Sequence, residues 1–434
     1  MDGLPVTALH IAAILLCALG YMFDLLEIAL GSVLSAVFST EPHVVRPQQL
    51  SLLLSSVYFG AIAGAPVLGW VADRHGRRNV LIGIQLWVAL MSLAAALTSD
   101  VSTLTVSRGL AGIALGAYPP IMMAYLTDML PPRRRGMLIF VTVAIASLGP
   151  ILGIFVIRWL TPLQPLGIEA WRWGFVLGGA GATLCGALFL LLPESPRWLQ
   201  AKGRHALGQA ACLRFERSRI WLRLPPSRAA QPISNPTPVD VSATEASLRG
   251  RWIKVGALYL LSPWSTVAFP LLSGAILTQK GFKLSDALLY VGLSSFGPLV
   301  GAVLVSLVID RIERRAALAM SAAAMIGAGV AFIASDTPLP LIVSSVLFNL
   351  FAYSYMSAVN LYCAELFPTK TRAAAVSGAW ALNRCGAAIA PLLLLPLLSN
   401  GGAMTMFAVI TGTLAASIVL LALLPPGQQR RAVS

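Results

Sequence analysis

The stretch Asp73-Arg74-His75-Gly76-Arg77-Arg78 decides the fold, because it returns 237 residues later as Asp310-Arg311-Ile312-Glu313-Arg314-Arg315. A second landmark repeats at the same distance: Asp128, Pro131 and Arg135 correspond to Glu365, Pro368 and Arg372. Two independent landmarks with one offset indicate two copies of one unit in tandem. Both landmarks lie in short polar breaks between long apolar runs. The repeated unit is therefore predicted to be a bundle of membrane helices.

The composition supports a membrane location for these apolar runs. Of the 434 residues, 57% are hydrophobic and only 11% are charged, which excludes an ordinary soluble protein. A bilayer core of roughly 30 Å requires about 20 apolar residues per helix. Charges and prolines delimit twelve such segments: 9–38, 49–72, 79–98, 103–129, 136–160, 172–192, 252–279, 285–309, 316–334, 339–366, 373–398 and 402–424. We predict an all-α membrane protein with twelve transmembrane helices in two six-helix, pseudo-symmetric bundles.

The repeat also predicts the domains and a class of function. We expect an N-terminal bundle over 1–192, a cytoplasmic linker over 193–250 and a C-terminal bundle over 251–434. The polar, proline-containing part of the linker predicts one or two short amphipathic helices and a flexible tether. Two repeated helical bundles are the plan of a secondary transporter, in which the substrate site lies between the halves.

The net charge of +14 comes from Lys and Arg residues that are concentrated in loops. Of the 31 Lys and Arg residues, 24 lie in alternate loops or in the C-terminal tail. The positive-inside rule places those loops and both termini in the cytoplasm. No folded basic surface is expected that would bind nucleic acid. The compact loops favour the inner membrane of a bacterium, and this architecture needs only a monomer in the lipid bilayer for a complete transport path.

Chemistry other than transport finds little support in the sequence. There is no soluble domain large enough for catalysis and no nucleophile with a placed base, so an enzyme is not expected. The five cysteines are scattered, and their spacing suggests neither a metal site nor disulfides. We expect no cofactor, with a proton as the coupling ion.

Five ordered motifs identify a family. The run Gly69–Arg78 resembles the signature between helices 2 and 3 of the major facilitator superfamily. In its second copy, Glu313 stands where Gly76 stands in the first. That second copy, Asp310–Arg315, is itself the second of the five motifs. The other three are similar to segments of the sugar porters and of their organic-ion and aromatic-acid relatives: Arg108–Gly136, Pro193–Leu199 and Ala364–Arg372. The resemblance implies a metabolite or aromatic-acid:proton symporter, or an organic-ion transporter, by alternating access.

The charged residues of these loops are predicted to form a cytoplasmic latch. An Asp at a helix end that faces guanidinium groups and a neighbouring helix N-terminus makes strong hydrogen bonds. Such contacts hold the two bundles together while the cavity is open outward, and breaking them allows the inward-open state. Alternatively, some of the arginines only set topology and contact lipid phosphates. The candidates are Asp73, Arg77, Arg78, Asp128, Arg135, Glu194, Arg197, Asp310, Glu365 and Arg372.

Charges within the membrane are costly and persist mainly for a task. Asp24 and Glu27 lie three residues apart on one face of helix 1, where two carboxylates resist ionising together. Arg108 in helix 4 is the expected partner of one of them. In proton-coupled sugar porters an Asp of helix 1 and an Arg of helix 4 form such a pair, and Asp24 and Arg108 match those places. The alternatives are a fixed structural ion pair, or direct contact of an acid with the substrate.

Arg384 in helix 11 predicts the substrate class. No acid lies in that helix to neutralise it, and a planar guanidinium suits a carboxylate. Organic-anion and aromatic-acid relatives carry a similar Arg in helix 11. The alternative is an ion pair between Arg384 and Glu27 or Asp24. Further candidates for the wall of the substrate site are polar or aromatic residues within helices: Tyr21, Tyr118, Trp264, Tyr290, Asn360, Trp380 and Asn383.

The sequence favours import of a small organic anion by proton symport. A drug or organic-cation antiporter is the main alternative, suggested by the paired acids of helix 1 and by the run Gly149–Gly153, which partly resembles an antiporter signature. A sugar:proton symporter is less favoured, because the run Leu260–Pro270 in helix 7 lacks the paired glutamines of sugar carriers.

Overall fold

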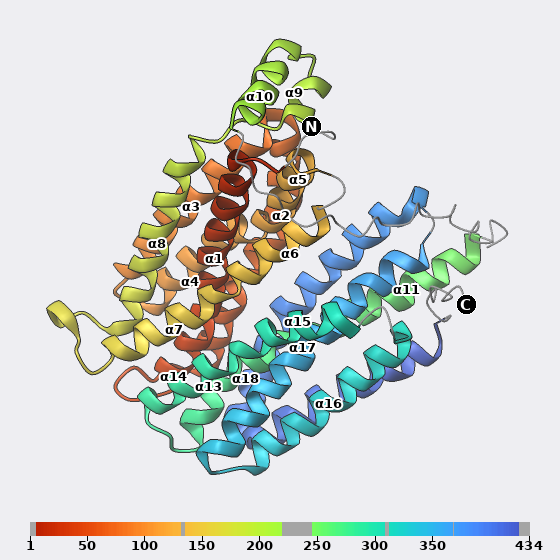
Figure 1. Cartoon of the computed structure of the whole chain (residues 1–434). Helices are drawn as coiled ribbons and strands as arrows, with labels where there is room; N and C mark the ends of the chain where they lie inside the picture. The colour runs from red at the N-terminus through yellow and green to blue at the C-terminus, as the bar shows by residue number, and fades with distance from the viewer. Residues whose placement is uncertain (1–5, 132–134, 219–244, 309–311, 368, 425–434) are drawn as a thin grey trace. The chain divides into compact units, whose positions relative to one another are not determined.

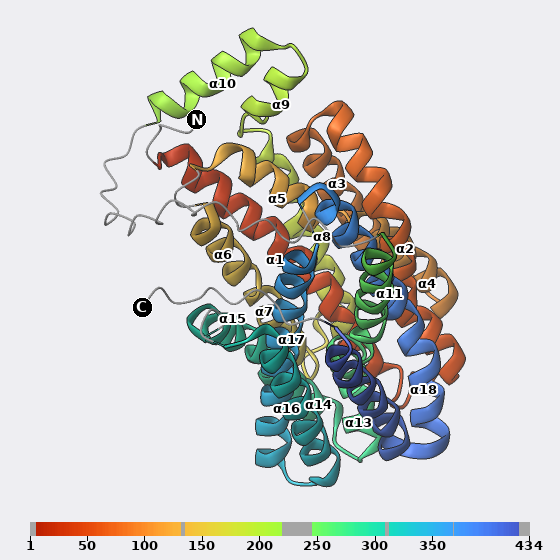
Figure 2. The ribbon, with the colours of Figure 1, turned by 90° about the vertical axis from the view of Figure 1, so that its right-hand side faces the viewer.

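The computed structural model describes residues 6–131, 135–218, 245–308, 312–367 and 369–424, and their regular secondary structure is helical (Figure 1 and Figure 2). The α-helices are α1 (Ala8–Val37), α2 (Pro47–His75), α3 (Arg77–Ala96), α4 (Val101–Leu115), α5 (Tyr118–Met129), α6 (Arg135–Ala146), α7 (Leu148–Leu160), α8 (Ala170–Phe189), α9 (Pro196–Ala201), α10 (His205–Arg217), α11 (Glu245–Leu261), α12 (Pro263–Thr266), α13 (Ala268–Gln279), α14 (Leu284–Ser294), α15 (Phe296–Val308), α16 (Arg314–Ala334), α17 (Pro338–Leu366) and α18 (Thr369–Ala422).

The helices account for the twelve predicted membrane spans. Ten stretches of the described chain are long and apolar enough to cross a bilayer. The last of these, Ala375–Ala422, contains Gly402, whose φ of 74° and ψ of 176° divide α18 into two spans. Helix α8, with 20 residues, overlaps the remaining predicted segment, 172–192. The chain is an integral membrane protein, and the predicted twelve-helix fold is confirmed.

Several spans are broken into two or three helices, and the breaks coincide with prolines. Helix α5 follows α4 with Pro119 and Pro120 in its first turn. The seventh span is divided into α11, α12 and α13, and α12 begins at Pro263. A proline ring removes one backbone hydrogen bond and clashes with the preceding turn, so these helices stop or bend there.

The repeat seen in the loops extends to the packing between helices. Gly60 and Gly64 of α2 lie against the backbone of α4, where a side chain on either glycine would overlap Gly109 or Ile113. The residues 237 positions later do the same: Gly297 and Gly301 of α15 lie against the backbone of α17 at Val346 and Leu350. The equivalent helix pairs therefore approach closely through equivalent glycines.

The described residues gather into two compact units. One contains the chain up to Ile28, Phe59–Gly153 and the chain from Arg172 through α10. The other contains Ala29–Tyr58, Ile154–Trp171 and the helices from α11 onward. The division of the sequence at 192 and 251 stays a prediction.

The linker contains two short helices, in agreement with the amphipathic helices expected there. Helices α9 and α10 lie at the end of the first unit, beside the ends of α1, α3 and α5 (Figure 1). Trp198 and Leu199 of α9 and Ala211 of α10 form a small buried core between the two helices. The linker residues 219–244 lie outside the described part of the chain.

Candidate functional site

A buried ion pair joins three helices of the first unit. Glu27 of α1 and Arg108 of α4 are 0% and 2% exposed. The Arg108 guanidinium donates from Nη1 to Glu27 Oε2 at 2.9 Å and from Nη2 to the main-chain oxygen of Glu27 at 2.9 Å. Ser92 of α3 donates from Oγ to Glu27 Oε1 at 2.5 Å. Both oxygens of the carboxylate therefore accept hydrogen bonds, which a buried charge requires.

Helix α8 packs against this pair through a glycine and a phenylalanine. A Cβ on Gly178 would lie 3.2 Å from the carboxyl carbon of Glu27, so a larger residue there would displace the acid. One turn earlier, the ring of Phe175 lies 5.4 Å from the guanidinium carbon of Arg108. The ring face stabilises the cation and excludes water from it. Glu27 and Arg108 are thus enclosed by α1, α3, α4 and α8.

Asp24 is the second acid on this part of α1. It is 2% exposed, and because α1 is helical through these positions it lies on the same face as Glu27. Nearby on the chain, the ring of Tyr21 stacks on that of Tyr118 at 6.1 Å, and the buried Tyr118 hydroxyl donates to the main-chain oxygen of Cys17 at 3.1 Å. The structure thus shows Glu27 as one ion-pair partner of Arg108. The match of Asp24 with Arg108 in proton coupling stays a prediction.

Arg384 occupies a half-buried position on α18 in the second unit. Its guanidinium carbon lies 5.5 Å from the ring centroid of Trp380, one turn earlier. Within the described residues, no carboxylate or hydrogen-bond acceptor contacts this guanidinium. A membrane-embedded cation with an aromatic ring on one side keeps its planar N–H fork available for an anion.

Amide and hydroxyl groups from three spans meet beside Arg384. The neighbouring Asn383, 4% exposed, donates from Nδ2 to Ser262 Oγ at 2.9 Å and to the main-chain oxygen of Tyr259 at 3.4 Å. The Tyr259 hydroxyl donates to Asn360 Oδ1 at 2.7 Å. The rings of Tyr259 and Trp380 meet edge to face at 6.2 Å. Four predicted residues, Asn360, Trp380, Asn383 and Arg384, therefore belong to one connected group.

The other two predicted residues of the second unit lie on different helices. Trp264 is half-buried in α12, directly after Pro263. Tyr290 of α14 is 6% exposed, and its ring meets that of Phe282 edge to face at 5.5 Å. A role of either residue in binding substrate stays a prediction.

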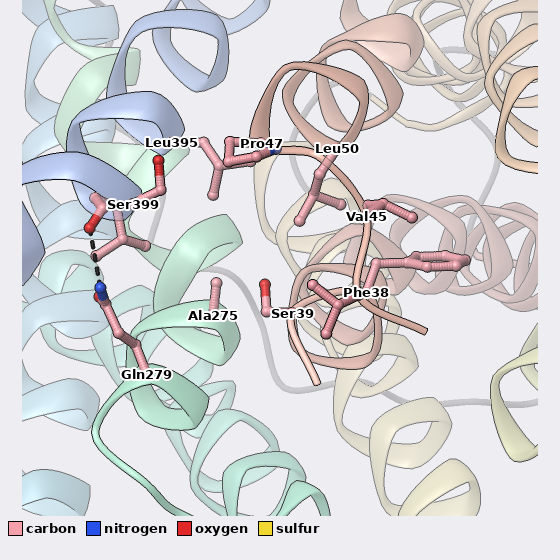
Figure 3. A pocket seen from close by; sticks show the side chains of 11 residues that line it. Phe38, Ser39, Val45, Pro47, Leu50, Ala275, Gln279, Leu395 and Ser399 are labelled. Carbon is pink, nitrogen blue, oxygen red and sulfur yellow. Dashed lines mark hydrogen bonds between the residues drawn. The ribbon is translucent and has the colours of Figure 1, made fainter. Parts of the chain in front are cut away.

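A separate cavity of about 290 Å³ lies in the second unit (Figure 3). Figure 3 shows that it is bordered by the segment between α1 and α2, by the start of α2, by α13 and by α18. The Gln279 amide beside it donates to the main-chain oxygen of Leu398 at 3.0 Å. The residues that line the cavity carry no charge: Phe38, Ser39, Val44, Val45, Pro47, Leu50, Ala275, Gln279, Leu395, Leu398 and Ser399. The lining offers no cation to hold a carboxylate, so the candidate anion site is the group around Arg384.

The first loop landmark forms a connected corner within the first unit. Arg77 pairs with Asp128, whose Oδ2 also accepts a hydrogen bond from Ser195 Oγ at 2.6 Å. The Glu194 carboxylate accepts from the main-chain nitrogens of Arg78 at 3.0 Å and Asn79 at 3.4 Å, at the start of α3. A carboxylate at a helix N-terminus is stabilised by the free N–H groups and the helix dipole.

The glycine in this corner is required by its conformation. Gly76 precedes α3 with φ 105° and ψ 145°, a region that residues with a Cβ avoid. A Cβ there would also press on the Glu194 carboxylate. Gly76 thus allows the helix to begin where the acid can cap it.

The second landmark repeats the ion pair. Arg314 Nε donates to Glu365 Oε1 at 3.0 Å, and these residues lie 237 positions after Arg77 and Asp128. Here α16 begins after Glu313, which has an ordinary φ of −57° and makes no side-chain hydrogen bond to the helix start. Sequence reasoning named Glu365 but not Arg314, although the offset from Arg77 identifies it.

The remaining latch candidates are distributed as follows. Asp73 is exposed, and its main-chain oxygen accepts from Trp198 Nε1 at 2.9 Å. Arg135 Nη2 lies 3.4 Å from the main-chain oxygen of Leu130. Arg197 is half-buried in α9. Asp310 lies outside the described residues, and Arg372 is in α18 with its side chain outside them. The contacts described at each corner join residues of one unit, and a latch between bundles stays a prediction.

Ser92, Gly178, Tyr259 and Ser262 were missed by sequence reasoning. Each is a common residue within an apolar helix, and the partners that give it a role come from other helices. Within the described residues, no three His, Cys, Asp or Glu side chains gather as a metal ion would require.

Comparison with known proteins decides the family. The model of the Major Facilitator Superfamily matches residues 11–333 and 255–434. The chain belongs to the major facilitator superfamily. A gallate transporter of Pseudomonas putida is 28% identical over 443 residues, covering 99% of this chain and 94% of that protein. The niacin transporter NiaP of Acinetobacter baylyi is 23% identical and covers 97% of this chain and 95% of its own length.

A solved structure shows the same fold. The xylose transporter XylE from E. coli, in a partially occluded inward-open conformation, has a TM-score of 0.75 at 18% identity and covers 98% of this chain. All of that XylE chain is covered as well. As a superfamily member with these relatives, the protein is a transporter of small molecules and not an enzyme.

Proposed function

We propose that this superfamily member is a proton-coupled symporter that imports a small organic carboxylate by alternating access. The observation that carries the proposal is the Arg384 guanidinium, half-buried in a membrane helix, with no acceptor among the described residues. A charge in such a place is costly unless a partner arrives. A carboxylate matches the two parallel N–H groups of a guanidinium and neutralises its charge.

The group around Arg384 supports an aromatic or otherwise planar carboxylate. The Trp380 ring lies beside the guanidinium, and the Asn360 and Asn383 amides add polar groups that are hydrogen-bonded to Tyr259 and Ser262. A few directed polar groups beside aromatic walls are typical of small-molecule sites. Two relatives named for aromatic acids, the gallate and niacin transporters, favour the same class.

The buried Glu27–Arg108 pair is the proposed proton-coupling element, with Asp24 as the second acid on α1. When Arg108 is bound, Glu27 remains ionised; when Arg108 moves away, the isolated carboxylate binds a proton, because a lone buried charge is unfavourable. Proton binding and helix movement are then linked, and this linkage couples the substrate to the proton gradient.

The antiporter alternative receives less support. The Glu27 carboxylate, which would attract a cation, is already paired with Arg108. Gly149 and Gly153 of the antiporter-like run lie against Met22 and Leu26 of α1, where larger residues would overlap, so close packing of α7 on α1 accounts for both glycines.

We also propose an oligomeric state, a membrane and an orientation for the protein. We place the protein as a monomer in a bacterial inner membrane, with both termini in the cytoplasm, because its basic loops alternate along the chain. The corners at Arg77–Asp128 and Arg314–Glu365 would then face the cytoplasm and regulate the opening of the inner side.

Uptake of labelled carboxylates into proteoliposomes tests the role of Arg384. Arg384→Gln should reduce uptake at subsaturating substrate by roughly ten- to a hundredfold. This factor corresponds to the binding free energy that a hydrogen-bonded ion pair contributes. Arg158→Gln is the matched control: it removes the same charge from a helix end where Nε only donates to the main-chain oxygen of Ser285. Equal uptake by the Arg384 variant and the wild type would contradict the carboxylate proposal.

A further inference from the structure

The two oxygens of the Glu27 carboxylate have different partners. Oε2 accepts from the charged Arg108 Nη1 at 2.9 Å, while Oε1 accepts from the neutral Ser92 hydroxyl at 2.5 Å. Arg108 also holds the main-chain oxygen of Glu27, so its guanidinium bridges the side chain and the backbone of one residue. Ser92 contributes no charge, and it comes from a different helix, α3.

We infer that Ser92 is a positioning residue that fixes Glu27 Oε1, so that Oε2 is the single oxygen at which Arg108 and the transported proton compete. The inference rests on the proposed function, in which Glu27 binds the proton. Ser92 carries no charge and lies outside the proposed Glu27–Arg108 pair, and the transported proton is assigned to one atom, Glu27 Oε2.

The geometry supports a fixed carboxylate. Ser92 is 1% exposed, and the space around the acid is closed by Gly178 of α8, where even a Cβ would lie 3.2 Å from the carboxyl carbon. Rotation of the carboxylate that exchanges Oε1 and Oε2 would break the Ser92 hydrogen bond in an enclosed site, which costs more than in water. The carboxylate therefore keeps its orientation when Arg108 departs.

The proton step then takes place at Oε2. As the Arg108 N–H leaves Oε2, a proton forms the O–H bond at that oxygen, and Glu27 becomes neutral while Arg108 keeps its positive charge. Ser92 continues to donate to Oε1, which is now the carbonyl oxygen of the acid. The reverse step releases the proton from Oε2 as Arg108 returns.

The charged neighbours of Glu27 come from two helices. Arg108 of α4 contacts it directly, and Asp24 lies three residues earlier on α1. Ser92 of α3 and Gly178 and Phe175 of α8 lie against the pair, and none of these three residues titrates. Loss of the Ser92 hydroxyl therefore changes one hydrogen bond to Glu27 without removing a charge.

Transport as a function of pH tests the inference. A donated hydrogen bond favours the ionised acid, so Ser92→Ala should move the midpoint of the pH profile of transport upward by about one pH unit. Ser92→Thr keeps the hydroxyl and should restore the wild-type profile. Ser107→Ala is the matched control: the Ser107 hydroxyl, 7% exposed and next to Arg108, bonds only to main-chain oxygens of its own helix.

Infrared difference spectroscopy gives a second readout that does not need transport. The carbonyl band of protonated Glu27, identified by its loss in Glu27→Gln, should lie at higher frequency in Ser92→Ala, because a carbonyl without a hydrogen-bond donor is stiffer. Unchanged pH midpoint and carbonyl band in Ser92→Ala would overturn the role of Ser92. A wild-type protein with no titrating band that depends on Glu27 would instead overturn the proposed proton coupling.

Discussion

Gly60 and Gly64 of α2 press against α4 in the first half of the chain, and Gly297 and Gly301 of α15 press against α17 in the second. The intramembrane charges show no such correspondence. At the same offset, Trp264 stands in place of Glu27, Ser345 in place of Arg108, and Ser147 in place of Arg384. The halves share the residues that pack helices, and each half has its own charges. This difference supports proton binding in the first half, at Glu27 and Arg108, and anion binding in the second half, at Arg384.

The loop corners show a smaller difference of the same kind. Both contain an Arg–carboxylate pair, at Arg77–Asp128 and Arg314–Glu365. Only the first has a glycine with a positive φ before the helix, together with the Glu194 carboxylate on the helix start. The position 237 residues after Glu194 lies outside the described chain. Substitutions in the first corner are therefore expected to destabilise the protein more than substitutions in the second.

The largest effect is expected where the halves agree. Gly64→Leu and Gly301→Leu both force a large side chain into a facing backbone, at Ile113 and Leu350, and should prevent assembly of the native bundle. Gly83→Leu is the control, because a Cβ at Gly83 would meet nothing within 4 Å. Size-exclusion chromatography of detergent-solubilised protein measures the folded fraction. Native behaviour of either glycine variant would show that the shared packing is not essential.

A residue exchange between the corners should give an intermediate effect. Gly76→Glu places the residue of the second corner in a backbone conformation that only glycine adopts readily, and against Glu194. We expect a loss of about 3 kcal/mol in stability from backbone strain, crowding and like charge. The reverse change, Glu313→Gly, should cost less than about 1 kcal/mol, because Glu313 makes no side-chain cap. Melting temperatures in detergent compare the two, and equal losses would remove the proposed difference between the corners.

Double-mutant cycles should reveal the smallest difference. In the first corner the Asp128 side chain is 13% exposed and is also held by Ser195, whereas in the second the Glu365 side chain is 23% exposed. We expect coupling of about 2 kcal/mol for Arg77 with Asp128 and about 1 kcal/mol for Arg314 with Glu365. Alanine cycles read by thermal unfolding measure both values. A larger value at the second corner would reverse the proposed order.

Much of the fold could be predicted because periodic hydrophobicity and repeated loop motifs are local signals. The spans and the break before Pro263 follow from apolar length and proline chemistry. The offset of 237 residues also predicts which residues correspond, and Arg314 with Glu365 satisfies it.

The contact between Glu27 and Arg108 could not be predicted in the same way. Asp24 and Glu27 lie on one face of a helix and are separated by less than one turn, so a long Arg side chain from another helix could contact either. The contact with Glu27 depends on room provided by Gly178 and on the Ser92 hydroxyl, both on helices distant in sequence. The polar group around Asn383 depends likewise on Tyr259 and Ser262, which carry no signal within an apolar helix.

The most direct test of carboxylate symport is the movement of protons in proteoliposomes that contain a pH-sensitive dye. Addition of a transported carboxylate outside should acidify the lumen, and the signal should be lost in Glu27→Gln and strongly reduced in Arg384→Gln. Carboxylate uptake with no change in lumenal pH would contradict proton coupling. Lumenal alkalinisation driven by an organic cation, unaffected by Arg384→Gln, would contradict the account and identify an antiporter.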